Sequence, residues 1–251
     1  MEGAALAVTE RGDPSAPAVV VAHGVGSTGE FAARCWSGCV GAGYRLVTYD
    51  LRGHGDSTPS ADAADHAIAT HARDLAAVAE ATRARVVGGT SLGAHVAAAY
   101  ASGATVDALL LAIPGALGKD EPTSRANAAV AAEIEATGVA ETLRRIAGDD
   151  AVPRWVVIEL ERSWPRHDPG SLAAALRAIA AEEAPAAVTD APTGVVGLVD
   201  DPAHPFPAAE AYVAALPRAA LESLTLAEWG ERRAILGDAA LAACRTAIAS
   251  R

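Results

Sequence analysis

Short apolar runs alternate with longer amphipathic segments along most of this chain. Apolar runs at Ala18–Ala22, Val106–Ile113 and Pro192–Val199 are the length of fully buried strands. Further strands are predicted at Ala4–Thr9, Tyr44–Tyr49 and Leu221–Leu226, and one more in the β-branched run that starts at Val86 and leads into Ser91. Helices are predicted at Phe31–Ala42, Ala67–Ala84, Ala208–Leu216 and Ala239–Ala249. This alternation predicts an α/β protein built on a mostly parallel sheet with helices on both faces.

The pattern changes between residues 116 and 191, where alanine-rich helical sequence replaces the alternation. A strand is possible in this region only over the ambiguous segment Trp155–Leu160. We interpret 116–191 as a helical lid inserted into a core formed by residues 1–115 and 192–251. Trp155 and Trp164 are distinctive lid residues, which either line apolar substrate space or pin the lid helices to the core.

Composition and charge narrow the classes of partner. The formal net charge of −11 disfavours nucleic acid and anionic membranes, because phosphates would be repelled. The start of the chain lacks a basic and apolar leader, and no stretch approaches 18 apolar residues, so we expect neither secretion nor membrane insertion. Three cysteines without a Cys-x-x-Cys pair predict reduced thiols and a cytoplasmic protein.

One short segment carries the clearest chemical pattern. Gly89-Thr90-Ser91-Leu92-Gly93 stands between a predicted strand and an alanine-rich helix, so Ser91 falls where the chain must reverse sharply. The flanking glycines suit such a turn, because neighbouring backbone packs close to it. The helix start beneath Ser91 offers free N–H groups to a developing negative charge.

Two other loops carry polar residues. His23-Gly24-Val25-Gly26 follows the strand at Ala18–Ala22, and it begins a glycine-rich loop that can bring backbone N–H groups close to a ligand. Its glycine spacing superficially imitates a dinucleotide-binding fingerprint, and Asp50 stands near the required distance, but the surrounding pattern disfavours that interpretation. The loop Asp50-Leu51-Arg52-Gly53-His54-Gly55-Asp56-Ser57 resembles a hydrogen-bonded turn, with His54 in a structural role.

Taken in order, these three segments resemble the His-Gly loop, the Asp-x-Arg-Gly-x-Gly-x-Ser turn and the nucleophile elbow of the α/β-hydrolase family. The resemblance covers essentially the whole chain. It implies Ser91 as nucleophile, with an oxyanion hole formed at the Gly24 loop by the N–H groups of Val25 and Leu92. Trp164 is the lid residue that we expect at the substrate.

The resemblance also implies a catalytic acid between Pro192 and Pro205. The spacing of that segment favours Asp201, but Leu198 stands where the family usually has glycine, so Asp200 remains open.

The family's usual base is missing. Its histidine would lie in the loop after the last strand, which here is Thr225–Gly230, yet no histidine follows His204. A serine without a base within hydrogen-bond reach is a poor nucleophile. His204 is the best substitute, because its loop follows a strand at the same sheet edge as Ser91. His95, His167 and Glu228 are the alternatives.

We therefore expect an enzyme that hydrolyses a small ester or thioester through Ser91 with an atypical base. The alternatives are a non-catalytic binding protein with the same fold, and a non-hydrolytic lyase or cyclase that uses the same pocket. The sequence signals no cofactor and no metal site, because its Asp and His residues lack metal-ligand spacing. It leaves the oligomeric state open.

Overall fold

The computed structural model describes residues 4–118 and 120–250, and seven strands within them form one sheet. The strands are β1 (Val8–Arg11), β2 (Ala18–Ala22), β3 (Arg45–Tyr49), β4 (Val86–Thr90), β5 (Ala108–Ala112), β6 (Thr193–Leu198) and β7 (Ala219–Leu224). Their order is β1-β3-β2-β4-β5-β6-β7, with β1 antiparallel to β3 and all other pairs parallel. Strand β4 is central, and Ser91 follows it directly.

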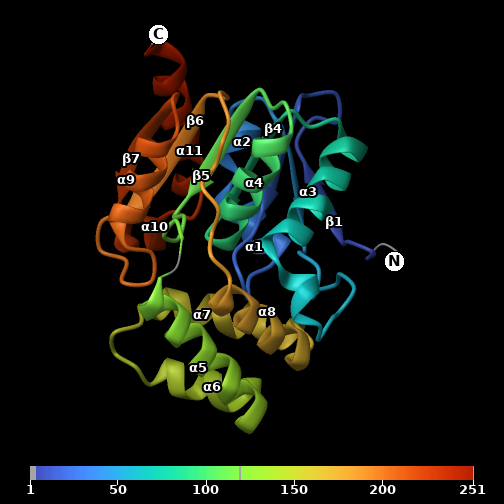
Figure 1. The fold of residues 1–251 in the computed structure, drawn as a ribbon, viewed down its shortest axis with the longest axis vertical. Coiled ribbons are helices and arrows are strands. Elements are labelled where there is room, and N and C mark those ends of the chain that lie inside the picture. Colours follow the sequence, from blue (N-terminus) through green and yellow to red (C-terminus); the bar gives the residue numbers. More distant parts are fainter. Residues whose placement is uncertain (1–3, 119, 251) are drawn as a thin grey trace.

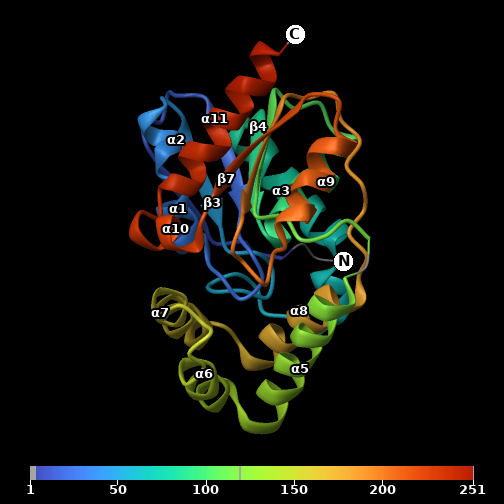
Figure 2. The same cartoon turned by 90° about the vertical axis from the view of Figure 1, so that its left-hand side faces the viewer.

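Helices cover both faces of this sheet, as Figure 2 shows. One face carries α1 (Gly29–Cys35), α2 (Gly38–Gly41), α10 (Leu226–Glu231) and α11 (Ile235–Ala249). The other carries α3 (Ile68–Thr82), α4 (Leu92–Gly103) and α9 (Phe206–Ala215). The fold class is the predicted one, a mostly parallel sheet between two layers of helices.

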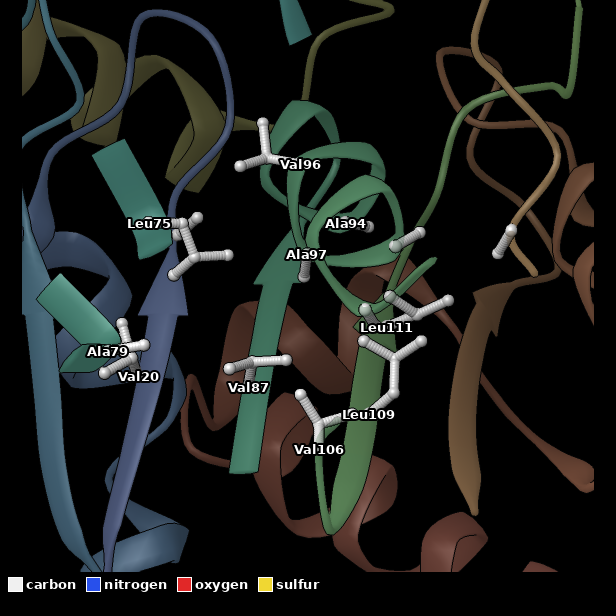
Figure 3. Close-up of a cluster of buried hydrophobic side chains, with 14 of the residues drawn as sticks. Val20, Leu75, Ala79, Val87, Ala94, Val96, Ala97, Val106, Leu109 and Leu111 are labelled. Carbon is white, nitrogen blue, oxygen red and sulfur yellow. The ribbon is translucent and has the colours of Figure 1, made fainter. Parts of the chain in front are cut away.

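Two hydrophobic clusters result from the period of two along each strand. In β2, Val20 joins the cluster beneath α3 and α4, whereas Val19 and Val21 join the cluster beneath α1 and α11. Figure 3 shows the first cluster, where Val20 and Val87 lie with Leu75 of α3. Strands buried on both faces explain why these runs are continuously apolar rather than alternating.

Four helices lie beyond one end of the sheet, and we call them the cap helices (Figures 1 and 2). They are α5 (Glu121–Thr137), α6 (Val139–Ala147), α7 (Arg154–Ser163) and α8 (Pro169–Ala181), with a 3-10 turn at Trp164–Arg166 after α7. They share a small hydrophobic cluster that includes Ala131, Ile134 and Leu172. The chain enters them after β5 and returns to the sheet at β6, so they stand over the carboxyl ends of the parallel strands.

Several predicted elements need correction. The ambiguous segment Trp155–Leu160 lies within helix α7 and forms no strand. The single helix predicted over Phe31–Ala42 is two helices, because the chain breaks around Trp36, whose buried indole N–H donates to Thr90 Oγ1 at 3.0 Å. The predicted loop after β7 contains helix α10. The first strand begins at Val8 rather than Ala4.

Candidate active site

Ser91 occupies a strained turn between β4 and α4. Its φ of 56° and ψ of −118° are unusual for a residue with a side chain, and such strain costs about 1–3 kcal/mol. The flanking glycines make the turn possible. A Cβ on Gly89 would stand 2.0 Å from the carbonyl oxygen of Gly93, and one on Gly93 would stand 2.1 Å from that of Ala22. The elbow predicted from the sequence is therefore enforced by backbone contacts.

A hydrogen-bonded relay runs from Ser91 into the loop after β6. Ser91 Oγ lies 2.8 Å from His204 Nε2, and His204 Nδ1 lies 2.8 Å from Asp201 Oδ2. Both partners of the serine thus come from one loop and stand three residues apart. The structure brings together the three residues predicted as nucleophile, acid and base, although the histidine is not where the family usually has it.

The two neighbouring aspartates have different contacts. Asp201 Oδ1 accepts the backbone N–H of Ala203 at 2.8 Å, and this bond orients the second carboxylate oxygen toward His204. Asp200 turns away and accepts the N–H of Leu226 at 2.7 Å, at the start of α10. Of the two candidates for the acid, Asp201 is the one in contact with a histidine.

Burial and hydrogen bonding act in opposite directions on Asp201, whose side chain is 8% exposed. Burial alone would raise the pKa of its carboxyl group, but the hydrogen bonds from His204 and from the backbone outweigh it and lower the pKa. The carboxyl group is therefore ionised at neutral pH. An ionised carboxylate accepts a hydrogen bond from the Nδ1–H group of His204, which leaves Nε2 free to accept one from the Ser91 hydroxyl.

The glycine-rich loop after β2 lies against Ser91, since a Cβ on Gly24 would stand 3.2 Å from Ser91 Cβ. Val25 is the next residue of that loop. Leu92 begins helix α4, so its backbone N–H has no acceptor in a preceding turn. The two predicted oxyanion donors thus belong to segments that meet at the serine.

Three buried histidines hold the backbone of this loop. His23 Nδ1 lies 2.7 Å from the Gly24 carbonyl oxygen, and His54 Nε2 accepts the N–H of Gly26 at 3.1 Å. His167, from the cap helices, places Nε2 3.0 Å from the Gly26 oxygen and accepts the N–H of Gly55 at Nδ1, at 2.8 Å. A histidine of the core and one of the cap therefore both hydrogen-bond to the backbone of Gly26.

Each of these rings is neutral. Burial lowers the pKa of His23 to about 4, and it lowers the pKa values of His54 and His167 as well. In each ring one nitrogen accepts a backbone N–H, so the other carries the proton and donates to a carbonyl oxygen. The sequence pattern did not reveal this function of His167, because its partners are more than 100 residues away.

A cavity of about 1030 Å³ lies between the serine and the cap helices. Ser91, His204 and Asp201 line it, and so do Trp155 of α7 and Trp229 of α10. The rings of Trp155 and Trp229 meet edge to face at 4.9 Å, and Arg233 lies over Trp155. An ion pair between Arg34 and Glu159 also anchors α7 to the core.

The expected position of Trp164 is wrong. Its side chain is 6% exposed, does not line the cavity, and packs in the cap cluster beside Gly26. Trp155 is the cap tryptophan at the cavity.

The other candidate bases have different partners. Glu228 accepts the N–H and the hydroxyl of Thr225 in a capping box at the start of α10. His95 lines the cavity and bonds to Tyr212, and His167 holds the Gly26 loop. Within residues 4–118 and 120–250, no group of three or more His, Cys, Asp or Glu residues is arranged to hold a metal ion.

The sheet, the elbow and the cavity beneath a helical cap define the class of protein, an α/β hydrolase. The model of the alpha/beta hydrolase family matches residues 19–243, and the chain belongs to this family. A search of curated proteins finds no match. No helix in the described part of the chain has the length and apolar character needed to cross a membrane.

Solved structures of the same fold include two esterases and a lactonase. A thermophilic esterase from Thermogutta terrifontis has a TM-score of 0.77 at 20% identity, with 96% of this chain and 93% of that chain covered. An esterase from Exiguobacterium antarcticum has a TM-score of 0.78 at 18% identity, with 97% of each chain covered. The enol-lactonase from Burkholderia xenovorans has a TM-score of 0.77 at 18% identity, with 99% of this chain and 96% of that chain covered.

Proposed function

We propose that this protein is a serine hydrolase that cleaves a small, largely apolar ester or thioester, with His204 as an unusually placed base. The observation that carries the proposal is the continuous relay Ser91–His204–Asp201, with 2.8 Å at both contacts. The serine stands at the floor of a cavity large enough for a drug-sized molecule. The two esterases and the lactonase among the similar folds agree with acyl transfer but do not identify a substrate.

In the proposed mechanism, Ser91 Oγ attacks the substrate carbonyl carbon while its proton passes to His204 Nε2. The carbonyl oxygen becomes an oxyanion, which the N–H groups of Val25 and Leu92 stabilise, each donor contributing about 3 kcal/mol. The C–O or C–S bond then breaks, and His204 returns the proton to the leaving group. Water, deprotonated by His204, releases the acid from the acyl-serine.

Asp201 acts through His204 in this scheme. Its carboxylate keeps the proton of the resting imidazole on Nδ1 and stabilises the imidazolium ion that forms during attack. We propose further that residues 116–191 act as a lid, because the cap helices cover the cavity and hold the Gly26 loop through His167. Expulsion of water by such a lid would strengthen the electrostatic contacts inside.

We propose a small-molecule substrate and a cytoplasmic location. The net charge of −11 argues against nucleic acid as a partner. Cys35, Cys39 and Cys244 are free and buried, as is usual for proteins of a reducing compartment.

The test uses a fluorophosphonate probe, which labels an activated serine with little dependence on substrate identity. We expect fast labelling of the native protein and none of Ser91→Ala. We expect labelling of His204→Ala to be slower by several orders of magnitude, because removal of a triad histidine costs on the order of 10⁶ in kcat. Glu228→Ala is the matched control at the family's usual histidine position, and it should label at the native rate.

Circular dichroism establishes that each variant is folded. A folded native protein that is not labelled would refute the proposal. Fast labelling that survives in His204→Ala would refute the assignment of the base and leave the nucleophile in place.

A further inference from the structure

His95 is a buried polar residue that the proposed mechanism does not use. It lies on α4 four residues after Ser91, and its backbone N–H donates to the Ser91 carbonyl oxygen at 3.4 Å. Its side chain lines the cavity although the residue is only 6% exposed. A polar ring at this depth needs partners for both nitrogens.

One ring nitrogen has a partner in the core. His95 Nδ1 lies 2.6 Å from the hydroxyl oxygen of Tyr212, a fully buried residue of α9. Among the residues that the structure describes, His95 is the only partner of this hydroxyl. A phenol whose single neighbour is an imidazole nitrogen donates its proton to it, and the imidazole proton then stands on Nε2.

The second nitrogen faces the cavity. A Cβ on Gly115 would stand 3.0 Å from His95 Nε2, so the absence of a side chain at Gly115 leaves room in front of that nitrogen. Gly115 lines the cavity too. No acceptor for Nε2 is found in residues 4–118 and 120–250. The Nε2–H group is therefore a donor without a partner, directed into the space beside the nucleophile.

Burial lowers the pKa of His95 to about 4, and a charge on His204 would lower it further. The ring is therefore neutral, and it offers a hydrogen bond rather than a positive charge. The described residues lining the cavity include five carboxyl groups and no lysine or arginine. These are Asp120, Glu159, Glu182, Asp200 and Asp201. An anionic substrate would be repelled, so the acceptor that suits His95 is an uncharged oxygen.

The cavity has different walls on the two sides of Ser91. Phe31 of α1 and Trp229 of α10 belong to helices on one face of the sheet, and Trp155 of the cap packs against Trp229. His95 belongs to α4 on the other face (Figure 2). A carbonyl carbon at Ser91 would send one substituent toward the aromatic wall and the other toward His95. Aromatic walls of this kind favour a flat apolar group.

From these contacts we propose that His95 is a specificity residue, which binds an uncharged keto or hydroxyl oxygen a few bonds from the scissile carbonyl. The preferred substrate is then a neutral oxygenated acyl ester whose alcohol part is apolar or aromatic. This inference rests on the proposed hydrolase function and names the substrate class of that site.

The experiment compares two esters that differ in one oxygen, phenyl 4-oxopentanoate and phenyl pentanoate. For the native enzyme we expect kcat/KM to favour the keto ester on the order of 10-fold, because the other ester leaves a buried donor unpaired. His95→Phe keeps a ring and loses the donor, so the ratio should fall to about 1. His95→Gln keeps an N–H donor and should restore part of the preference.

Thermal unfolding shows whether each variant is folded. If His95→Phe does not fold, His95→Gln still allows the test. Equal kcat/KM values for the two esters in the native enzyme would overturn the role of His95, while labelling of Ser91 would leave the hydrolase function standing. An unchanged ratio in His95→Phe would overturn it too. A native enzyme inactive on both esters and unreactive toward the fluorophosphonate would refute the hydrolase function and this inference together.

Discussion

The substitution Asp201→Asn tests the least usual part of the proposed site, an acid placed three residues before the base. In the native protein both carboxylate oxygens are occupied, Oδ2 by His204 Nδ1 and Oδ1 by the N–H of Ala203. Asparagine has one acceptor oxygen and one NH₂ group, so it can satisfy only one of these donors. The outcome depends on which contact the oxygen keeps.

If the amide oxygen faced His204, its NH₂ group would face the N–H of Ala203. Two opposed donors at a side chain only 8% exposed would cost about 1–3 kcal/mol. We therefore expect the oxygen to keep Ala203 and the NH₂ group to donate to His204 Nδ1. The imidazole proton then moves to Nε2, where it blocks transfer from Ser91. The same tautomer error in a serine protease costs about 10⁴ in kcat, or about 5 kcal/mol.

The assay is steady-state hydrolysis of a p-nitrophenyl ester by the native enzyme, Asp201→Asn and Asp200→Asn. The neighbouring substitution is a matched control, because the amide oxygen that it introduces can still accept the N–H of Leu226. We expect kcat to fall about 10⁴-fold for Asp201→Asn and less than about 10-fold for Asp200→Asn. The reverse order would move the acid to Asp200, and near-native activity of both variants would refute the tautomer argument.

Two further predictions concern the buried histidines. His167→Ala leaves the Gly26 oxygen and the Gly55 N–H without their partner, so we expect kcat to fall roughly 10-fold to 100-fold with little change in KM. His167→Gln should recover part of the lost kcat. An effect on KM alone would contradict a positioning role. Burial lowers the pKa values of His23 and His95 to about 4 and of His71 to about 3, so the unfolded chain binds more protons below pH 6.5 and stability falls with acidification. Between pH 8 and 5 the three groups together remove about 6 kcal/mol, comparable with the whole stability of a domain. Circular dichroism should therefore show acid unfolding near pH 5 for the native protein and at a lower pH for His71→Leu. An acid-unfolding midpoint that this substitution leaves unchanged would refute the argument.

The sequence predicted the central strands of the sheet well because β2, β4, β5 and β6 are buried on both faces. The run Ala18–Ala22 is a strand with those bounds, a strand precedes Ser91 as predicted, and the elbow stands where its glycines indicated. The contact between Ser91 and His204 was also predictable, since both follow parallel strands at one sheet edge. Their catalytic roles stay predictions.

Other features depend on distant contacts. Trp155–Leu160 has a β-branched run, yet it forms a helix because Trp155 and Glu159, one turn apart, both contact the core. Helix α10 did have a local signal, the Thr225-x-x-Glu228 capping box, which the interpretation as a loop missed. The positions of Trp164 and His167 depend on the contact between the cap and the Gly26 loop, and no local sequence pattern predicts that contact.

Because Asp201 and His204 lie in one loop, the proposed catalytic residues are separate from the segment after β7 that lines the cavity. All three members of the proposed relay stand between residues 91 and 204, whereas Leu226, Ala227 and Trp229 after β7 line the cavity and belong to no part of that relay. An enzyme with its base in that last loop cannot change the loop without moving the base. In this chain the side chains after β7 that line the cavity can change without moving the proposed base. Substrate preference can therefore be engineered, or can evolve, in this region while the proposed proton relay stays intact.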